Sequence, residues 1–125
     1  MRKILIIDDE KEFCDLLCLR LEKAGPYEVI KAENGELGVQ AVLDKKPDLI
    51  ILDISMPKMN GFQVIEALEK DTQAQKIPII ILTASTSKET TQKIIAAQVK
   101  GCLVKPFSPP ELMKKIHQAL GENHG

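Results

Sequence analysis

The sequence is poor in the residues that mark several classes of protein. Aromatic residues make up only 3% of the 125 residues and tryptophan is absent, so a core has to be built from aliphatic side chains. The three cysteines are too few, and odd in number, for a disulfide framework, which favours a reducing compartment. The net charge is −1 and the pI about 6.1, without the basic excess that nucleic-acid binders usually show.

Long apolar runs are also missing. Residues 1–3 are followed by only four apolar residues, too few for a secretory leader, and no stretch is long enough to cross a membrane. We therefore expect a cytoplasmic protein with no membrane association and no direct nucleic-acid partner. Cys14 and Cys18 are one helical turn apart but lack a nearby Cys/His pair, so they are expected to be packing residues rather than metal ligands.

The apolar residues that are present form short continuous runs separated by longer amphipathic stretches. Continuous runs are typical of strands that are buried on both faces of a parallel sheet. The predicted fold class is α/β, with right-handed helical crossovers placing helices on both faces of the sheet. Residues 1–121 are expected to form one domain, and 122–125 a short polar tail. The expected strands lie at 4–7, 29–30, 49–52, 79–82 and 102–104.

Helical periodicity fills the stretches between these runs, and turn residues mark where helices stop and start. Gly25 and Pro26 end the first helix, while Ser108 is expected to cap the last helix with Pro109 in its first turn. The apolar residues expected on the helices are Phe13, Leu16, Leu17, Leu21 and Ala24; Val39, Ala41, Val42 and Leu43; Phe62, Val64, Ile65 and Leu68; Ile94, Ile95 and Ala97; and Leu112, Met113, Ile116 and Leu120.

Charged or hydroxyl side chains directly follow four of the five expected strands. The first strand ends at residues 8–10 (DDE), the third at Asp53, the fourth at Thr83 and the fifth at Lys105. Ligands of open parallel sheets bind beyond the carboxyl ends of the strands, so these side chains are expected to meet at one edge. Each of these residues, taken alone, could have an ordinary structural role, as a helix start, a solvated turn or a surface residue. Their placement together at four strand ends favours a functional site.

The chemistry of this set fits phosphoryl transfer. Asp8, Asp9 and Asp53 would repel one another by roughly 3 kcal/mol per pair at about 5 Å. A hard cation such as Mg²⁺ would relieve that repulsion, and a carboxylate can attack phosphorus as a nucleophile. Lys105 and Thr83 can bind the phosphoryl oxygens, which supplies the positioning and charge neutralisation that this reaction needs.

Four motifs in this order resemble those of the receiver domains of bacterial-type response regulators. They are 6–10 (IIDDE), 48–61 (DLIILDISMPKMNG), 81–84 (ILTA) and 103–107 (LVKPF), within a similarity that covers about residues 3–120. The resemblance implies a doubly wound, flavodoxin-like, five-stranded parallel sheet of order 2-1-3-4-5. It also implies a phosphoacceptor that acts only on its own phosphorylation and dephosphorylation, rather than an enzyme in the usual sense.

The resemblance further implies a role for each site residue. Asp53 would be the phosphoacceptor and a metal ligand, Asp9 the direct Mg²⁺ ligand, and Asp8 a ligand acting largely through water. Ser55 would contribute its backbone carbonyl to the metal.

Thr83 would supply a hydroxyl that moves toward the phosphoryl group, and Lys105 would pair with that group. The peptide bond from Lys105 to Pro106 is expected to be cis. The implied partners are a sensor histidine kinase or histidine phosphotransfer protein as donor, and a downstream effector. A homodimer through the fourth and fifth helices and the fifth strand is also open.

Three positions depart from the family pattern. Asn60 stands where Asp is common, but that position is not a ligand. The pair 98–99 reads Gln-Val where Gly-Ala is usual, and Cys102 stands where an aromatic residue usually couples the site to the output face. We therefore expect switching to rest on residues 84–88 and the start of the fourth helix, unless a neighbour such as Leu103 or Phe107 replaces the aromatic side chain.

Three other functions fit the sequence less well. An aspartyl-phosphate phosphatase of the haloacid dehalogenase type would carry a second acid where Ser55 stands, and would need a cap domain. A flavodoxin-like cofactor binder would need a phosphate-binding loop where residues 8–10 are acidic. A non-phosphorylated interaction module would not require the intact set of Asp8, Asp9, Asp53, Thr83 and Lys105.

Overall fold

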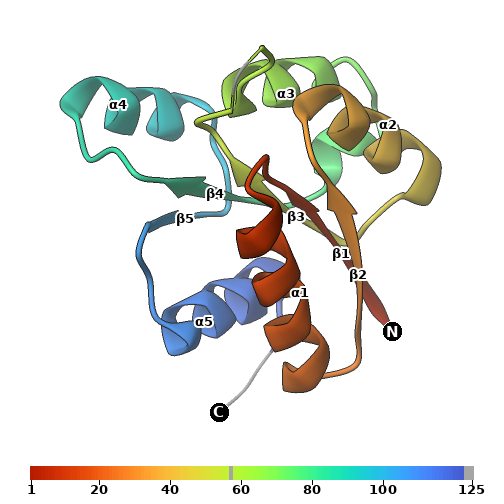
Figure 1. Cartoon of the computed structure of the whole chain (residues 1–125). Helices are drawn as coiled ribbons and strands as arrows, with labels where there is room; N and C mark the ends of the chain where they lie inside the picture. The colour runs from red at the N-terminus through yellow and green to blue at the C-terminus, as the bar shows by residue number, and fades with distance from the viewer. Residues whose placement is uncertain (57, 123–125) are drawn as a thin grey trace.

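The computed structural model describes residues 1–56 and 58–122. Pro57, part of the second motif, and residues 123–125 of the expected tail lie outside the described residues. Strands and helices alternate along the chain (Figure 1). The elements are β1 (Arg2–Ile7), α1 (Lys11–Ala24), β2 (Tyr27–Ala32), α2 (Gly35–Lys45), β3 (Leu49–Asp53), α3 (Gly61–Leu68), the 3-10 helix η1 (Ala74–Lys76), β4 (Ile79–Thr83), α4 (Lys88–Ala96), β5 (Gly101–Val104) and α5 (Pro109–Leu120).

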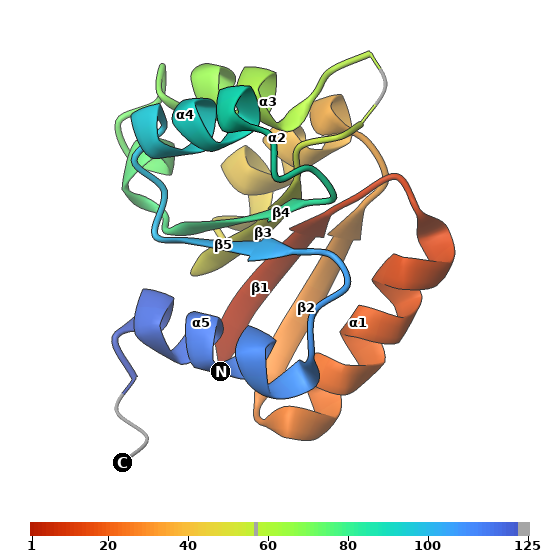
Figure 2. The same ribbon diagram turned by 90° about the vertical axis from the view of Figure 1, so that its left-hand side faces the viewer.

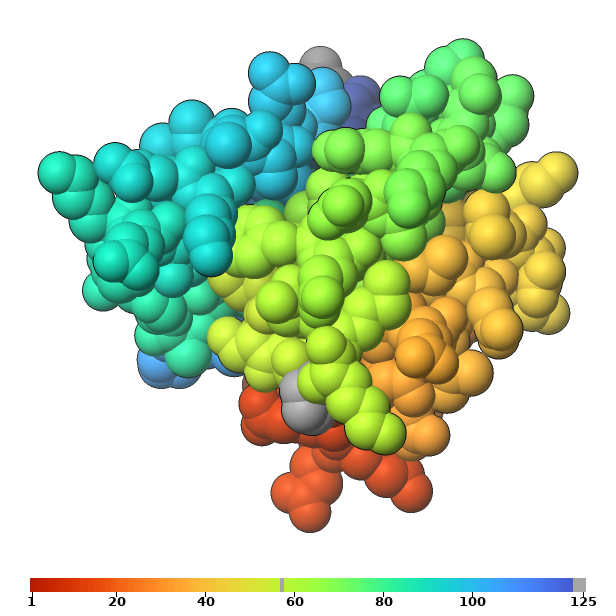
Figure 3. Space-filling model, turned by 90° about the horizontal axis from the view of Figure 1, so that it is seen from above, coloured from red at the N-terminus to blue at the C-terminus, as the bar shows by residue number. Residues whose placement is uncertain are grey.

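The five strands form one parallel sheet in the order β2-β1-β3-β4-β5, which confirms the predicted fold. Helices α1 and α5 cover one face, and α2, α3 and α4 cover the other (Figure 2). Seen from above, α4, α3 and α2 lie in a row over their face (Figure 3). The order of the strands reverses between β1 and β3, and ligands of such sheets bind at this switch point.

The central strands are buried on both faces, as their continuous apolar sequence predicts. In β1, Ile4 and Ile6 pack toward α1 and α5, while Leu5 and Ile7 pack toward α2 and α3, and all four are fully buried. Side chains alternate between the faces because successive residues of a strand point in opposite directions. The carboxyl end of β1 is therefore fixed by core packing on two sides, which gives the site a rigid base.

The loop between β3 and α3 is held by a helix cap and a close backbone approach. Asn60 and Gln63 form a capping box at the start of α3. A Cβ at Gly61 would lie only 2.6 Å from the Cα of Ile54, so no larger residue fits there without movement. Ser108 and Glu111 form a second capping box at α5, which confirms the cap predicted from the sequence.

Several apolar residues assigned to the helices do not face the core. Leu16 is 54% exposed, Leu43 46% and Ile95 70%, although all three lie on helices as expected; Ala24, at the end of α1, is exposed too. Each lies beside the helix face that contacts the sheet. Successive residues of a helix are about 100° apart around its axis, so an apolar residue next to a buried one can still face solvent. Helix α4 has no fully buried residue, so it is the helix with the weakest anchorage to the core among those described.

The connection from α4 to β5 contains a left-handed residue. Gln98 has a φ of 55°, a conformation that glycine adopts without strain and other residues adopt at a cost. This explains why glycine is usual at this position in the family pattern. In the part of the chain that the structure describes, no helix has the length and apolar character needed to cross a membrane.

Candidate phosphoacceptor site at the carboxyl edge of the sheet

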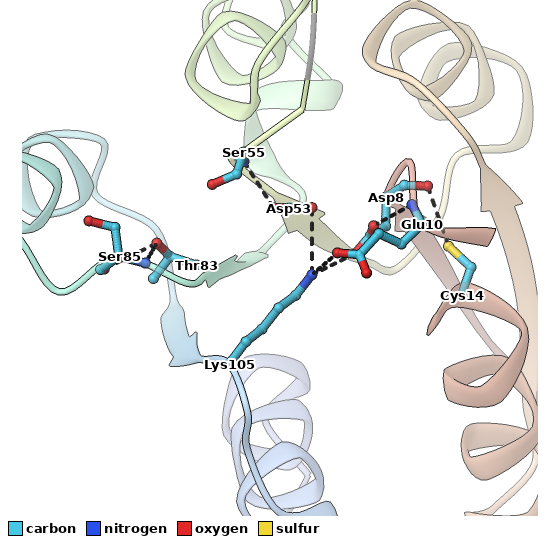
Figure 4. Close-up of polar contacts among 8 residues, drawn as sticks. All are labelled: Asp8, Glu10, Cys14, Asp53, Ser55, Thr83, Ser85 and Lys105. Atoms are coloured by element: carbon cyan, nitrogen blue, oxygen red, sulfur yellow. Dashed lines mark hydrogen bonds and ion pairs between the residues drawn. The ribbon is translucent and has the colours of Figure 1, made fainter. Parts of the chain in front are cut away.

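Three of the predicted site residues meet at the carboxyl ends of β1, β3 and β5. The ammonium of Lys105, which follows β5, lies 3.1 Å from Asp8 Oδ2 and 3.6 Å from Asp53 Oδ2 (Figure 4). It also lies 3.5 Å from Glu10 Oε1. Three carboxylates therefore share one ammonium, which leaves a formal charge of −2 in the cluster. The bond from Lys105 to Pro106 is cis, as the resemblance implies.

The two central carboxylates are buried and each is fixed by a backbone N–H group. Asp8 accepts a 2.9 Å hydrogen bond from the N–H of Glu10, and Asp53 accepts one of 2.9 Å from the N–H of Ser55. Burial raises the pKa of Asp8 above its ordinary value, and repulsion from Asp53 adds to the rise against the opposing pull of Lys105. Asp8 is thus a carboxylate whose negative charge is incompletely compensated.

Lys105 responds to the same cluster from the opposite side. Burial by itself lowers the pKa of Lys105, but the charges of Asp53 and Asp8 outweigh that effect and raise it above its ordinary value. The side chain is only 18% exposed. Lys105 is therefore a permanent cation held beside the candidate nucleophile.

The structure gathers carboxylate oxygens of Asp8, Glu10 and Asp53 within 4.8 Å of one another. The sequence assigned no role to Glu10, because the only feature that could have pointed to one is its place as the third of three consecutive acidic residues. It is the N-cap residue of α1, and its side chain reaches back to Lys105. Asp9, the expected direct metal ligand, is exposed and lies outside this group of three.

Thr83 and Ser55 lie at the same edge with their own local partners. The Thr83 hydroxyl is buried at the end of β4, where it donates to the carbonyl of Ser85 at 3.2 Å and accepts from its N–H at 3.0 Å. Ser85 in turn contacts Ser87 and Thr90 through hydroxyl groups, which links Thr83 to the start of α4. Ser55 is exposed and orients Asp53 through its backbone.

Comparison with known proteins decides the family. The model of the response regulator receiver domain matches residues 4–117. The chain belongs to the response regulator receiver domain family. Protein PilH of Pseudomonas aeruginosa is 39% identical over 122 residues, which are 96% of this chain and 98% of PilH. Accepting a phosphoryl group in two-component signalling is the function of this family, and a receiver domain is not an enzyme in the usual sense.

Two further relatives show the range of proteins that carry this receiver. The phosphate regulon regulatory protein PhoB of P. aeruginosa is 35% identical over 95% of this chain, but the match covers 52% of PhoB. The chain thus spans about half the length of PhoB. Among solved structures, the chemotaxis protein CheY4 of Vibrio cholerae superposes with a TM-score of 0.89 at 36% identity, over 96% of this chain and 99% of CheY4.

Cys102 remains an unusual feature of this receiver. It lies on β5 beside Ile81 of β4, half-buried against the core that faces α2, α3 and α4. Burial raises the pKa of its thiol above the ordinary value, so it stays a neutral side chain near pH 7. The receiver therefore has a small apolar group at the position where the family pattern has an aromatic ring.

Proposed function

We propose that Asp53 is the residue of this receiver that accepts the phosphoryl group. The observation that carries the proposal is the position of its carboxylate, buried at the end of β3, with Oδ1 fixed by the Ser55 N–H and Oδ2 facing Lys105. One oxygen is oriented while the other is presented to an incoming phosphoryl group beside a cation. The proposed donor is a phosphohistidine of a sensor histidine kinase or of a histidine phosphotransfer protein.

The proposed transfer is a simple displacement at phosphorus. An oxygen of Asp53 forms the new bond to phosphorus while the bond from phosphorus to the donor's imidazole nitrogen breaks. The electron pair of the broken bond stays with the imidazole nitrogen, which takes up a proton from water. Lys105 and the hydroxyl of Thr83 then bind the phosphoryl oxygens, which requires the Thr83 hydroxyl to leave its bonds with Ser85.

The acidic cluster fits a divalent cation in charge and ligand type. Receiver domains bind Mg²⁺ at an acidic site, and here three carboxylates against one ammonium leave two negative charges within 4.8 Å. We propose that Asp8, Asp9, Asp53 and the backbone carbonyl of Ser55 hold Mg²⁺, with the carboxylate of Glu10 beside them. Bound there, Mg²⁺ would neutralise the charge of the phosphoryl oxygens and relieve the repulsion between Asp8 and Asp53.

The output of the receiver is proposed to run through α4. The hydroxyl contacts from Thr83 through Ser85 to Thr90 join the site to a helix that has no fully buried residue. Movement of Thr83 toward the phosphoryl group would break these contacts and change the start of α4 without an aromatic side chain at Cys102. We propose that a downstream effector binds according to this change. A homodimer through α4, β5 and α5 is proposed as a second form of output. The domain, residues 1–121, is proposed to work in the cytoplasm.

The proposal is tested by intact-mass measurement after incubation with acetyl phosphate. The wild-type chain should gain one phosphoryl group with Mg²⁺ and none when Mg²⁺ is removed by a chelator. Asp53→Asn should gain none under either condition, whereas the control Asp15→Asn, a surface carboxylate paired with Lys31, should gain one as the wild type does. Equal incorporation by Asp53→Asn and wild type would show that the assignment is wrong.

A further inference from the structure

The ammonium of Lys105 has an aromatic partner in addition to the carboxylates. Its Nζ lies 4.3 Å from the centroid of the Phe13 ring, over the face of the ring. Phe13 is in the first turn of α1, so the contact joins the loop after β5 to the helix after β1. A lysine ammonium over a ring face is attracted by the ring quadrupole, and the attraction grows as water is excluded.

The Phe13 ring is itself held in place by a second ring. Phe107, two residues after Lys105, meets Phe13 edge to face, with ring centroids 6.1 Å apart and planes at 88°. Both rings are partly buried and pack against the core between the sheet, α1 and α5. The ring that faces Lys105 is therefore fixed by the core and by the same loop that carries the lysine.

We infer that Phe13 is a positioning residue for phosphoryl transfer, because its ring holds the Lys105 ammonium beside Asp53. This inference rests on the proposed function of Asp53. The ion pairs of Lys105 with Asp8 and Asp53 change during the reaction, since the Asp53 carboxylate becomes an acyl phosphate. The ring contact takes no part in bond making, so it restrains the ammonium before, during and after transfer.

A second phenylalanine of the chain provides a matched control. The ring of Phe62, in the first turn of α3, lies 5.8 Å from the ammonium of Lys93. Phe62 is partly buried like Phe13 but packs on the opposite face of the sheet. Phe62→Leu therefore removes a ring and a lysine contact of the same kind without touching the site.

The test is the rate of phosphoryl incorporation at saturating Mg²⁺. The donor is acetyl phosphate, a small molecule that needs no docking surface. Phe13→Leu should slow incorporation by about three- to tenfold, because loss of an ammonium–ring contact should lower by about that factor the population in which Lys105 lies beside Asp53. Phe13→Tyr keeps the ring face and should restore most of the rate, while Phe62→Leu should react as the wild type does. If thermal unfolding shows that Phe13→Leu is not folded, Phe13→Met takes its place as the variant without a ring.

A double-mutant cycle with Lys105→Met separates positioning from packing. If Phe13 acts through Lys105, Phe13→Leu should change the slow residual rate of Lys105→Met by less than about twofold, because coupled residues are not additive. An equal loss in both backgrounds, or no loss in the wild-type background, would overturn the inference while the Asp53 assignment stands. Absence of incorporation by the wild type would instead overturn the proposed function, and this inference with it.

Discussion

Replacement of Asp8 by Asn should stabilise the receiver when no divalent cation is present. The side chain of Asp8 has no exposed surface, and its charge is opposed by Asp53 and favoured by Lys105. Asn has the same shape and can still accept the hydrogen bond from the Glu10 N–H at Oδ1. The substitution therefore removes a buried charge with little change in packing.

The expected gain follows from three opposing contributions. At the 4.8 Å limit of the cluster, repulsion between Asp8 and Asp53 is about 3.5 kcal/mol at an effective dielectric of about 20. Attraction to Lys105 at 3.1 Å is about 5 kcal/mol on the same basis. Attraction exceeds repulsion by about 2 kcal/mol on these figures, and the several kcal/mol that burial of a carboxylate costs are somewhat larger than this difference. The pKa of Asp8 is raised, which agrees with a net cost of its charged form in the folded protein. Asp8→Asn should therefore raise the free energy of unfolding by about 1–2 kcal/mol, or the melting temperature by roughly 4–8 °C.

The dependence on pH has a defined sign. Because the pKa of Asp8 in the folded protein is raised above its ordinary value of 3.8, the folded state binds this proton more tightly than the unfolded state. The contribution of the protonated Asp8 carboxyl to the free energy of unfolding is fully present below about pH 3.8 and is lost as the pH rises through the pKa of the folded protein. The advantage of Asp8→Asn should therefore be largest near neutral pH and shrink on acidification.

The assay is thermal unfolding in low salt with a chelator, for wild type, Asp8→Asn and Asp15→Asn. Asp15 is an exposed partner of Lys31, so its neutralisation should not raise the melting temperature. Mg²⁺ should raise the melting temperature of the wild type more than that of Asp8→Asn, because the variant has lost a ligand. An unchanged or lower melting temperature for Asp8→Asn in chelator would refute the electrostatic reasoning.

Three further results are expected. Gly61→Ala should lower stability by about 1–3 kcal/mol in urea titration, because the added methyl group lies 2.6 Å from Ile54 Cα; an unchanged midpoint would show that the loop yields freely. Gln98→Gly should raise stability by about 0.5–1 kcal/mol by relieving the left-handed strain at φ 55°, and a loss of stability would contradict this. Burial raises the pKa of Cys14 to about 12, so iodoacetamide at pH 8 should modify Cys102 before Cys14 in the folded protein, as peptide mass mapping would show.

The fold could be predicted from the sequence because the central strands are buried on both faces. The continuous runs at 4–7, 49–52 and 79–82 match β1, β3 and β4 closely. The edge strand β2 is longer than its two-residue signal at 29–30, because its exposed Glu28 and Lys31 interrupt the apolar pattern. Helix faces were the weakest prediction, since an apolar residue beside the buried stripe, such as Ile95, is indistinguishable from a core residue in the sequence alone.

The sequence could predict those site residues that directly follow the ends of the strands. Asp8, Asp53 and Lys105 meet because the sheet order brings their strands together. The direction of side chains beyond the strand ends depends on loop paths that no sequence period encodes. For that reason the sequence did not indicate that Glu10 turns back to Lys105, or that the Phe13 ring lies against its ammonium.

The central claim is that Asp53 carries the phosphoryl group, and peptide mapping by tandem mass spectrometry tests it most directly. The receiver is phosphorylated with acetyl phosphate and Mg²⁺, digested under conditions that preserve acyl phosphates, and the modified residue is located. The expected result is one phosphoryl group on Asp53, with unmodified acids at 8–10. A phosphoryl group on Asp8, Asp9 or Glu10 in place of Asp53 would contradict the account.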